Sequence, residues 1–268
     1  MPLAARRALG QDPPMVGSSK STAPSPPRHG VARALSKRGI ASRSVAATWV
    51  RAGRVRVNGC TVLDPEFAVR SGVDTIEIEG VAATARDFVA IMLNKPRGLV
   101  TTARDERGRD TVYRCLDGTG LPWLGPVGRL DKASEGLLLL CNDPAWAASI
   151  TGPDAGVAKT YHVQVDSVPD EALLARVRDG VHVDGERLAC RAVRLLRSGA
   201  RRAWLEIVLE EGRNRHIRRL LEAVGLGVVR LVRVAVGPLE LGSLPKGAWR
   251  LLTDAEIALF APVAPPTR

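Results

Sequence analysis

Alternating and helical patterns divide the first ordered part of the chain into short elements. Residues 31–38 have helical periodicity that ends at Gly39, and Ser42 is placed to cap a second helix that ends at Gly53. Residues 54–58 alternate between apolar and polar positions, and Asn58-Gly59 is typical of a tight hairpin turn. Residues 75–80 alternate in the same way. The pattern predicts a small helix–hairpin domain over residues 29–82.

From about residue 87 the pattern indicates a second, larger domain. Strands are expected at 88–94, 137–141, 160–165, 194–196 and 203–209. Helices are expected at 111–116, 144–150, 169–178 and 214–224, the third beginning with Pro169 and the last capped by Asn214. No regular β-α-β period connects these elements, so residues 87–262 are predicted to form an α+β domain with a mixed or antiparallel sheet.

The composition indicates a charged binding partner. The 268 residues are 45% hydrophobic, with a formal net charge of +11 and a pI near 10.3. Such an excess indicates a polyanionic partner and does not bear on the fold. Residues 1–28 are rich in Pro, Ser, Gly and Arg and are predicted to be a disordered basic tail. This tail either attracts RNA non-specifically or is a dispensable extension.

Several classes of protein are disfavoured by what the sequence lacks. The four cysteines are scattered without ligand spacing, which argues against a zinc site and a disulfide framework, so no metal is expected. No apolar run approaches the roughly 20 residues of a membrane span, and a cytoplasmic protein is expected. No glycine-rich nucleotide loop is found, so no nucleotide cofactor is indicated.

One segment places a carboxylate where a charge is costly. Asp131 lies in GRLDKASEG, a glycine-flanked turn that leads into the apolar run of residues 137–140. An Asp before a strand is, taken alone, usually a turn or capping residue. A carboxylate next to a fully apolar strand nevertheless makes Asp131 a candidate nucleophile or base.

Three segments of the larger domain resemble the RNA pseudouridine synthases. They are NKPRGLVTT with GRLDKASEGLLLL, then KTYHVQV, then EGRNRHIRRLLEAVG. The similarity is greatest to the ribosomal RNA branch, of RsuA and RluB type, in which the third motif has Gln where this chain has His216 and the first has Thr where it has Ser134. The segments SKRGIASR, AGRVRVNG and DTIEI resemble the small RNA-binding (alpha-L) domain of ribosomal protein S-four. The resemblance covers about residues 31–260.

This resemblance implies a reaction and three site residues. Uridine in RNA loses its C1′–N1 bond, rotates and rejoins through C5, without cofactor or redox change. Asp131 is implied to be the catalytic carboxylate, Tyr161 to lie against a flipped-out base and help remove the C5 proton, and Arg218 to pair with the carboxylate. Attack on C1′, attack on C6 and a glycal route all remain open.

Basic side chains on both domains are expected to contact RNA phosphates. They are Arg38, Arg43, Arg51, Arg54, Arg56, Lys95, Arg97, Arg129, Arg213, Arg215 and Arg219. His162 and His216 are interpreted as polar groups near the pocket rather than zinc ligands.

The predicted function is isomerisation of uridine in ribosomal RNA, with a slight preference for the 23S RNA of the large subunit (RluB-like). A 16S synthase and a catalytically inactive ribosome-assembly factor are the alternatives. An RNA methyltransferase would need a glycine-rich cofactor loop that is not found. The resemblance also implies a monomer.

Overall fold

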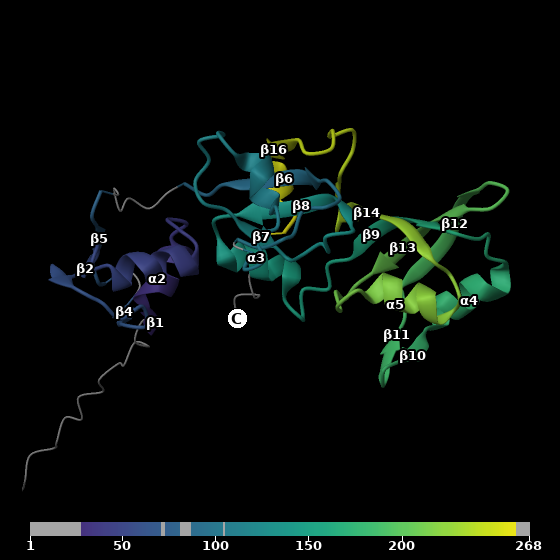
Figure 1. The fold of residues 1–268 in the computed structure, drawn as a ribbon, viewed down its shortest axis with the longest axis horizontal. Coiled ribbons are helices and arrows are strands. Elements are labelled where there is room, and N and C mark those ends of the chain that lie inside the picture. Colours follow the sequence, from purple (N-terminus) through teal and green to yellow (C-terminus); the bar gives the residue numbers. More distant parts are fainter. Residues whose placement is uncertain (1–27, 71–72, 81–86, 104, 261–268) are drawn as a thin grey trace, which may run out of the picture.

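Two regions with separate hydrophobic cores make up the computed structural model (Figure 1), which describes residues 28–70, 73–80, 87–103 and 105–260. The predicted disordered tail therefore lies outside the described residues, apart from Arg28. Within the part of the chain that is described, no helix has the length and apolar character needed to cross a membrane.

The N-terminal region packs two helices against short strands. Strand β1 (Arg28–Gly30) pairs with β4 (Ala68–Arg70), and helices α1 (Val31–Lys37) and α2 (Arg43–Arg51) follow β1. The hairpin of β2 (Val55–Val57) and β3 (Cys60–Thr61) is completed by β5 (Ile76–Ile78) on the other side of β2. Ser42 accepts the amide of Val45 at 3.2 Å, which confirms the predicted cap.

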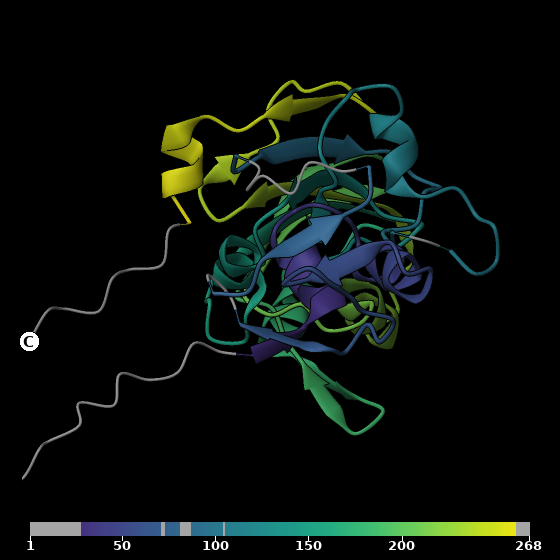
Figure 2. The same ribbon diagram turned by 90° about the vertical axis from the view of Figure 1, so that its left-hand side faces the viewer.

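A nine-stranded sheet organises the C-terminal region, and Figure 2 views it from the N-terminal end of the molecule. Its main path runs β12-β13-β9-β14-β8-β6-β16, while β7 pairs with β8 and β15 with β14. The strands are β6 (Ala90–Lys95), β7 (Gly125–Val127), β8 (Glu135–Cys141), β9 (Lys159–Val165), β12 (Ala192–Ser198), β13 (Ala203–Leu209), β14 (Val228–Val236), β15 (Leu239–Glu240) and β16 (Trp249–Leu251). Among the described strand pairs of this sheet, only β14 with β8 is parallel. The predicted α+β domain with a mixed, mainly antiparallel sheet is confirmed.

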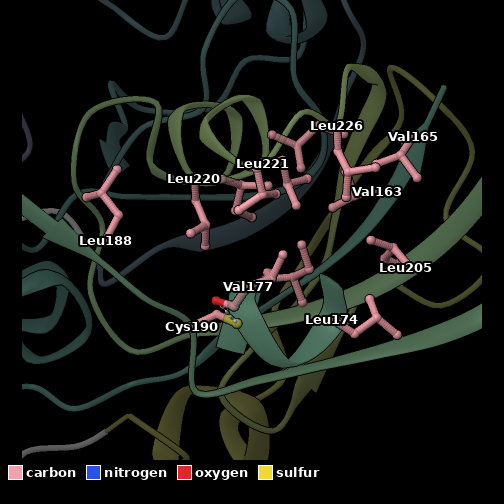
Figure 3. Packing of buried hydrophobic residues seen from close by; sticks show 14 of the residues in the cluster. Val163, Val165, Leu174, Val177, Leu188, Cys190, Leu205, Leu220, Leu221 and Leu226 are labelled. Carbon is pink, nitrogen blue, oxygen red and sulfur yellow. Dashed lines mark hydrogen bonds between the residues drawn. The ribbon is translucent and has the colours of Figure 1, made fainter. Parts of the chain in front are cut away.

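Two halves of this sheet are covered differently. Strands β6 and β8 are buried along their whole length because both of their faces are covered. Helices α3 (Pro144–Thr151) and α6 (Asp254–Ala258) contribute to the core on one face. The 3-10 helix η1 (Val112–Leu116) contributes to the core on the other face. In the other half, α4 (Glu171–Asp179) and α5 (His216–Ala223) supply the core, part of which is shown in Figure 3. There β13 alternates between buried and half-buried residues, so one face stays open.

Some predicted boundaries need correction. Helix α4 begins after Asp170, whose side chain accepts the amide of Leu173 at 2.8 Å, so Pro169 precedes the cap instead of opening the helix. The cap of α5 is Arg215, with a left-handed φ of 49°, and not Asn214. The hairpin of β10 (Val181–Val183) and β11 (Glu186–Leu188) and the strand β14 had not been predicted.

Candidate active site

Asp131 lies in the loop that connects β7 to β8. Its neighbour Leu130 is buried, and the Leu130 carbonyl accepts a hydrogen bond from the Thr101 hydroxyl at 2.7 Å. The amide of Ser134 donates to the carbonyl of Asp131 at 2.9 Å, which closes a tight turn. The backbone on both sides of the carboxylate is therefore fixed while the Asp131 side chain stays partly accessible.

Lys95, at the end of β6, holds this loop through hydrogen bonds to backbone carbonyls. Its side chain has no exposure to solvent. Its Nζ donates to the carbonyls of Ser134 at 2.8 Å, Pro96 at 3.1 Å and Asp131 at 3.3 Å. Burial lowers the pKa of Lys95 to about 8, against an opposing effect of the Asp131 carboxylate. The expectation that Lys95 contacts phosphate is corrected here, because a fully buried ammonium with three carbonyl partners does not face RNA.

Arg218 reaches the same loop from helix α5. Its guanidinium donates to the carbonyl of Ala133 at 3.2 Å and to that of Val228 at 3.3 Å. Among the ion pairs of the described residues, none joins Arg218 to Asp131, so the expected direct pair is replaced by a contact to the loop backbone. Burial lowers the pKa of Arg218 and Arg215 adds to that effect, whereas Asp131 acts in the opposite direction. The Arg218 Nε is buried without a hydrogen-bond partner.

Tyr161 comes from β9 and faces the core that α4 and α5 cover. It lies opposite Arg233 of β14 in the sheet register. Arg233 is 5% exposed, and its Nε donates to the carbonyl of Leu137 at 2.7 Å. Lys159 of β9 is half-buried, and burial lowers its pKa, with a further contribution from Arg233. Sequence reasoning missed Arg233 and Lys159, although Lys159 opens the KTYHVQV motif.

Two hollows meet at the Asp131 loop. One, with a volume of about 420 Å³, is lined by Asp131, Tyr161 and Arg218 together with Lys159, Arg233 and His216. The other, of about 710 Å³, is lined by residues 100–102, 105–107, 109 and 129–132. Arg129, Leu130 and Asp131 line both. The three predicted catalytic residues, far apart in sequence, are thus brought into one cavity large enough for a nucleotide.

His216 occupies a buried position in this cavity wall. Its Nε2 lies 2.9 Å from the carbonyl of Ala189, so this nitrogen carries the proton. Its Nδ1 is buried without a hydrogen-bond partner, and the Glu211 carboxylate lies 4.0 Å away. Burial lowers the pKa of His216, which favours the neutral ring. No group of three His, Cys, Asp or Glu side chains among the described residues is arranged to hold a metal ion.

The expected RNA-contacting arginines fall into three positions. Arg97, Arg129, Arg213 and Arg215 are exposed around the Asp131 loop and the start of α5. Arg219 instead forms ion pairs with Asp184 at 3.2 Å and Glu186 at 3.0 Å, and so fixes the β10–β11 hairpin. On the N-terminal region Arg43, Arg51, Arg54 and Arg56 are exposed and Arg38 is half-buried. Of these, Arg43 pairs with Glu66 at 2.7 Å.

Comparison with known proteins assigns both regions. Residues 89–223 match the family model described as RNA pseudouridylate synthase, and residues 31–74 match the S4 domain. The chain belongs to the RNA pseudouridine synthase family. The synthase is 33% identical over 228 residues to ribosomal large subunit pseudouridine synthase B of Bacillus subtilis (strain 168), covering 84% of this chain and 92% of that protein.

Two further comparisons agree with this assignment. The synthase is 36% identical over 226 residues to an RNA pseudouridine synthase of Aquifex aeolicus (strain VF5), covering 84% of this chain and 90% of that one. A crystal structure of a pseudouridylate synthase superposes with a TM-score of 0.61 at 29% identity, covering 87% of this chain and all of the other. The expected family, its S4 domain and its isomerase activity on RNA are therefore confirmed.

Proposed function

We propose that this synthase converts uridine to pseudouridine in the 23S RNA of the large ribosomal subunit, with Asp131 as the catalytic carboxylate. The observation that carries the role of Asp131 is its place at the junction of the two hollows, on a loop anchored by Lys95, Thr101 and Arg218. A fixed backbone holds the carboxylate in one orientation and lowers the reorganisation needed during reaction.

The remaining cavity residues fit a uridine turned out of its helix. Tyr161 presents an aromatic ring beside Asp131, and a ring of this kind stacks on an extruded base. Its hydroxyl is the group that we assign to removal of the C5 proton. Arg218 holds the loop through Ala133 and is thus a positioning residue for the carboxylate.

The large-subunit target is supported by similarity to the Bacillus subtilis protein whose name states that substrate. The S4 domain supports RNA docking next to the catalytic region, through the exposed Arg43, Arg51, Arg54 and Arg56. We further propose domains at 29–82 and 87–262, which the separate hydrophobic cores support, and action as a cytoplasmic monomer.

Mapping pseudouridine in total ribosomal and transfer RNA tests this proposal. Cells that lack the protein are compared with cells rescued by wild type or by Asp131→Asn. We expect one 23S site to be lost on deletion and restored by wild type alone, while purified Asp131→Asn binds RNA normally. A lost 16S site would contradict the large-subunit target, and restoration by Asp131→Asn would contradict the catalytic role and favour an assembly factor.

A further inference from the structure

We propose that the open face of the β12-β13-β9-β14 half-sheet, on the side away from the Asp131 cavity, binds the phosphate backbone of substrate RNA outside the segment that carries the target uridine. The side chains of these four strands alternate between the two faces of the half-sheet. The proposed binding requires RNA as the substrate, which family membership establishes, and it does not depend on the role of Asp131 or on which uridine is modified.

The strand register separates the two faces. Tyr161, Ile207 and Arg233 share one cross-strand row on the cavity side. The neighbouring residues of each strand therefore point to the opposite side, which α4 and α5 do not cover. Trp204 and Glu206 of β13 are accordingly half-buried between the fully buried Ala203, Leu205 and Ile207.

One row of the open face combines arginine with tryptophan. Arg197, Trp204, Gln164 and Arg230 occupy paired positions on β12, β13, β9 and β14. The guanidinium carbons of Arg197 and Arg230 lie 5.3 Å and 5.8 Å from the centre of the Trp204 ring. Such cation–π contacts hold long side chains in place, so binding an anion costs them less conformational freedom.

The arginines of this face that form no ion pair among the described residues lie toward the β12–β13 turn. In the next row Arg194 is paired with Glu206 at 2.6 Å, and the buried Glu135 accepts from both Arg230 and Lys246. By contrast, no carboxylate pairs with Arg197, or with Arg201 and Arg202 of the β12–β13 turn, among the residues that the structure describes. These three arginines are exposed, and the turn projects at the right-hand end of the molecule in Figure 1.

This arrangement fits a phosphate backbone better than a base-reading site. Guanidinium groups bind phosphate through paired N–H donors, and contacts of this kind carry no sequence information. Two arginines already approach the Trp204 ring, so we assign the ring to ordering these cations rather than to stacking on a base. Because β12 is the edge strand, RNA entering the cavity on one face can pass around this edge and reach the other.

The test compares two double variants of the full chain that remove the same charge. Arg201→Ala/Arg202→Ala changes the β12–β13 turn, and Arg176→Ala/Arg178→Ala changes exposed arginines of α4 on the covered side. Each is measured for affinity to a long transcript of large-subunit ribosomal RNA and to a short stem–loop, over a range of salt. Circular dichroism confirms that both variants are folded.

For Arg201→Ala/Arg202→Ala we expect binding to the long transcript to weaken on the order of tenfold at physiological salt. The slope of log affinity against log salt should become shallower by about 1.4 to 1.8, or roughly 0.7 to 0.9 for each lost phosphate contact. Affinity for the stem–loop and the turnover rate at saturating RNA should match wild type, and the α4 variant should match wild type throughout.

Two results would overturn the proposal. Equal weakening of RNA binding by both double variants would show that only the net charge of the protein matters. Unchanged RNA binding by the turn variant would exclude RNA as the partner of this face and would favour an acidic protein surface instead. If instead the proposed catalytic role is wrong, Asp131→Asn will turn over substrate like wild type. The two double variants will still differ in their affinity for the long transcript.

Discussion

Lys95 carries a charge at a position without exposure to solvent. It serves the loop rather than the RNA, since its three hydrogen bonds go to Ser134, Pro96 and Asp131 carbonyls. The ammonium form supplies the three donors that these acceptors require. Loss of its proton is therefore expected to loosen the backbone that carries Asp131, the proposed catalytic carboxylate.

Lys95→Met tests this positioning role. We expect kcat to fall by one to two orders of magnitude, while RNA affinity and its salt slope stay at the wild-type level. Wild-type activity should decline as pH rises through about 8, where Lys95 deprotonates, and this decline should be absent in Lys95→Met. A shallower salt slope in the variant would instead support a direct contact between Lys95 and an RNA phosphate, and would contradict the positioning role.

The same pKa determines how stability depends on pH. Because the pKa of Lys95 is about 8 in the folded chain and 10.5 ordinarily, the folded state holds fewer protons than the unfolded state between these values. The contribution of Lys95 to the free energy of unfolding therefore increases from about pH 8 to 10.5, while activity decreases.

Tyr161→Phe separates stacking from proton transfer. The ring and its packing against the α4–α5 core remain, so we expect RNA affinity within about twofold of wild type. Without the hydroxyl, we expect single-turnover isomerisation to slow by about 10² to 10⁴. Parallel losses in affinity and rate would show that Tyr161 only positions the base.

The sequence was informative for these residues only where a motif carries chemistry. Asp131, Tyr161 and Arg218 could be predicted because each lies in a recognisable segment, and the structure gathers them in one cavity. The burial of Lys95 could not, because it arises only when residues 131–134 fold across the end of β6. Arg233 was missed because β14 itself was not predicted, so nothing in the sequence placed this arginine beside Tyr161.

At the scale of elements, β8 and β14 determine the position of the Asp131 loop. Their parallel pairing begins at Glu135 and Gly136, directly after the loop. Gly136 has a φ of 102°, and a Cβ there would lie 2.2 Å from the carbonyl oxygen of Arg233. The glycine thus permits both the turn out of the loop and the close approach of two backbones.

Gly136→Ala is expected to be severely destabilising. Backbone atoms of Arg233 cannot yield as a flexible side chain would, and the positive φ adds strain. We expect the free energy of unfolding to fall on the order of 3 kcal/mol, measured by urea denaturation. Gly212→Ala, with nothing within 4 Å of its added Cβ, serves as the control and should unfold like wild type.

Elements with strong local signals were predicted well, and others were not. The helix after Ser42 and the apolar strand β8 follow from a cap and an uninterrupted apolar run. Helix α5 was placed correctly but its cap was wrong, because Arg215 adopts a left-handed conformation that composition does not favour. The β10–β11 hairpin, which α5 holds through Arg219, depends on tertiary ion pairs.

The whole molecule combines an S4 domain and a catalytic domain with separate cores. We expect residues 81–268 to fold without the S4 domain, since the described buried clusters do not mix residues of the two regions. Deleting residues 1–80 should weaken RNA binding and flatten its salt dependence, because exposed arginines of the S4 domain are lost. Binding titrations at several salt concentrations measure this, with thermal unfolding as the control for folding. Affinity and salt slope equal to those of the full chain would exclude the S4 domain from docking.

The parallel contact between β8 and β14 also has a consequence for biosynthesis. Glu135 and Arg230, which pair across it, are 95 positions apart, so the Asp131 loop obtains its final support only after β14 has been synthesised. Contacts of this separation form late because closing a long loop is entropically costly. The S4 domain, in contrast, pairs strands that all lie within residues 28–78, so it leaves the ribosome before the catalytic domain is complete. A nascent chain can therefore hold RNA before it can modify it, and any truncation before β14 yields an RNA binder without a catalyst.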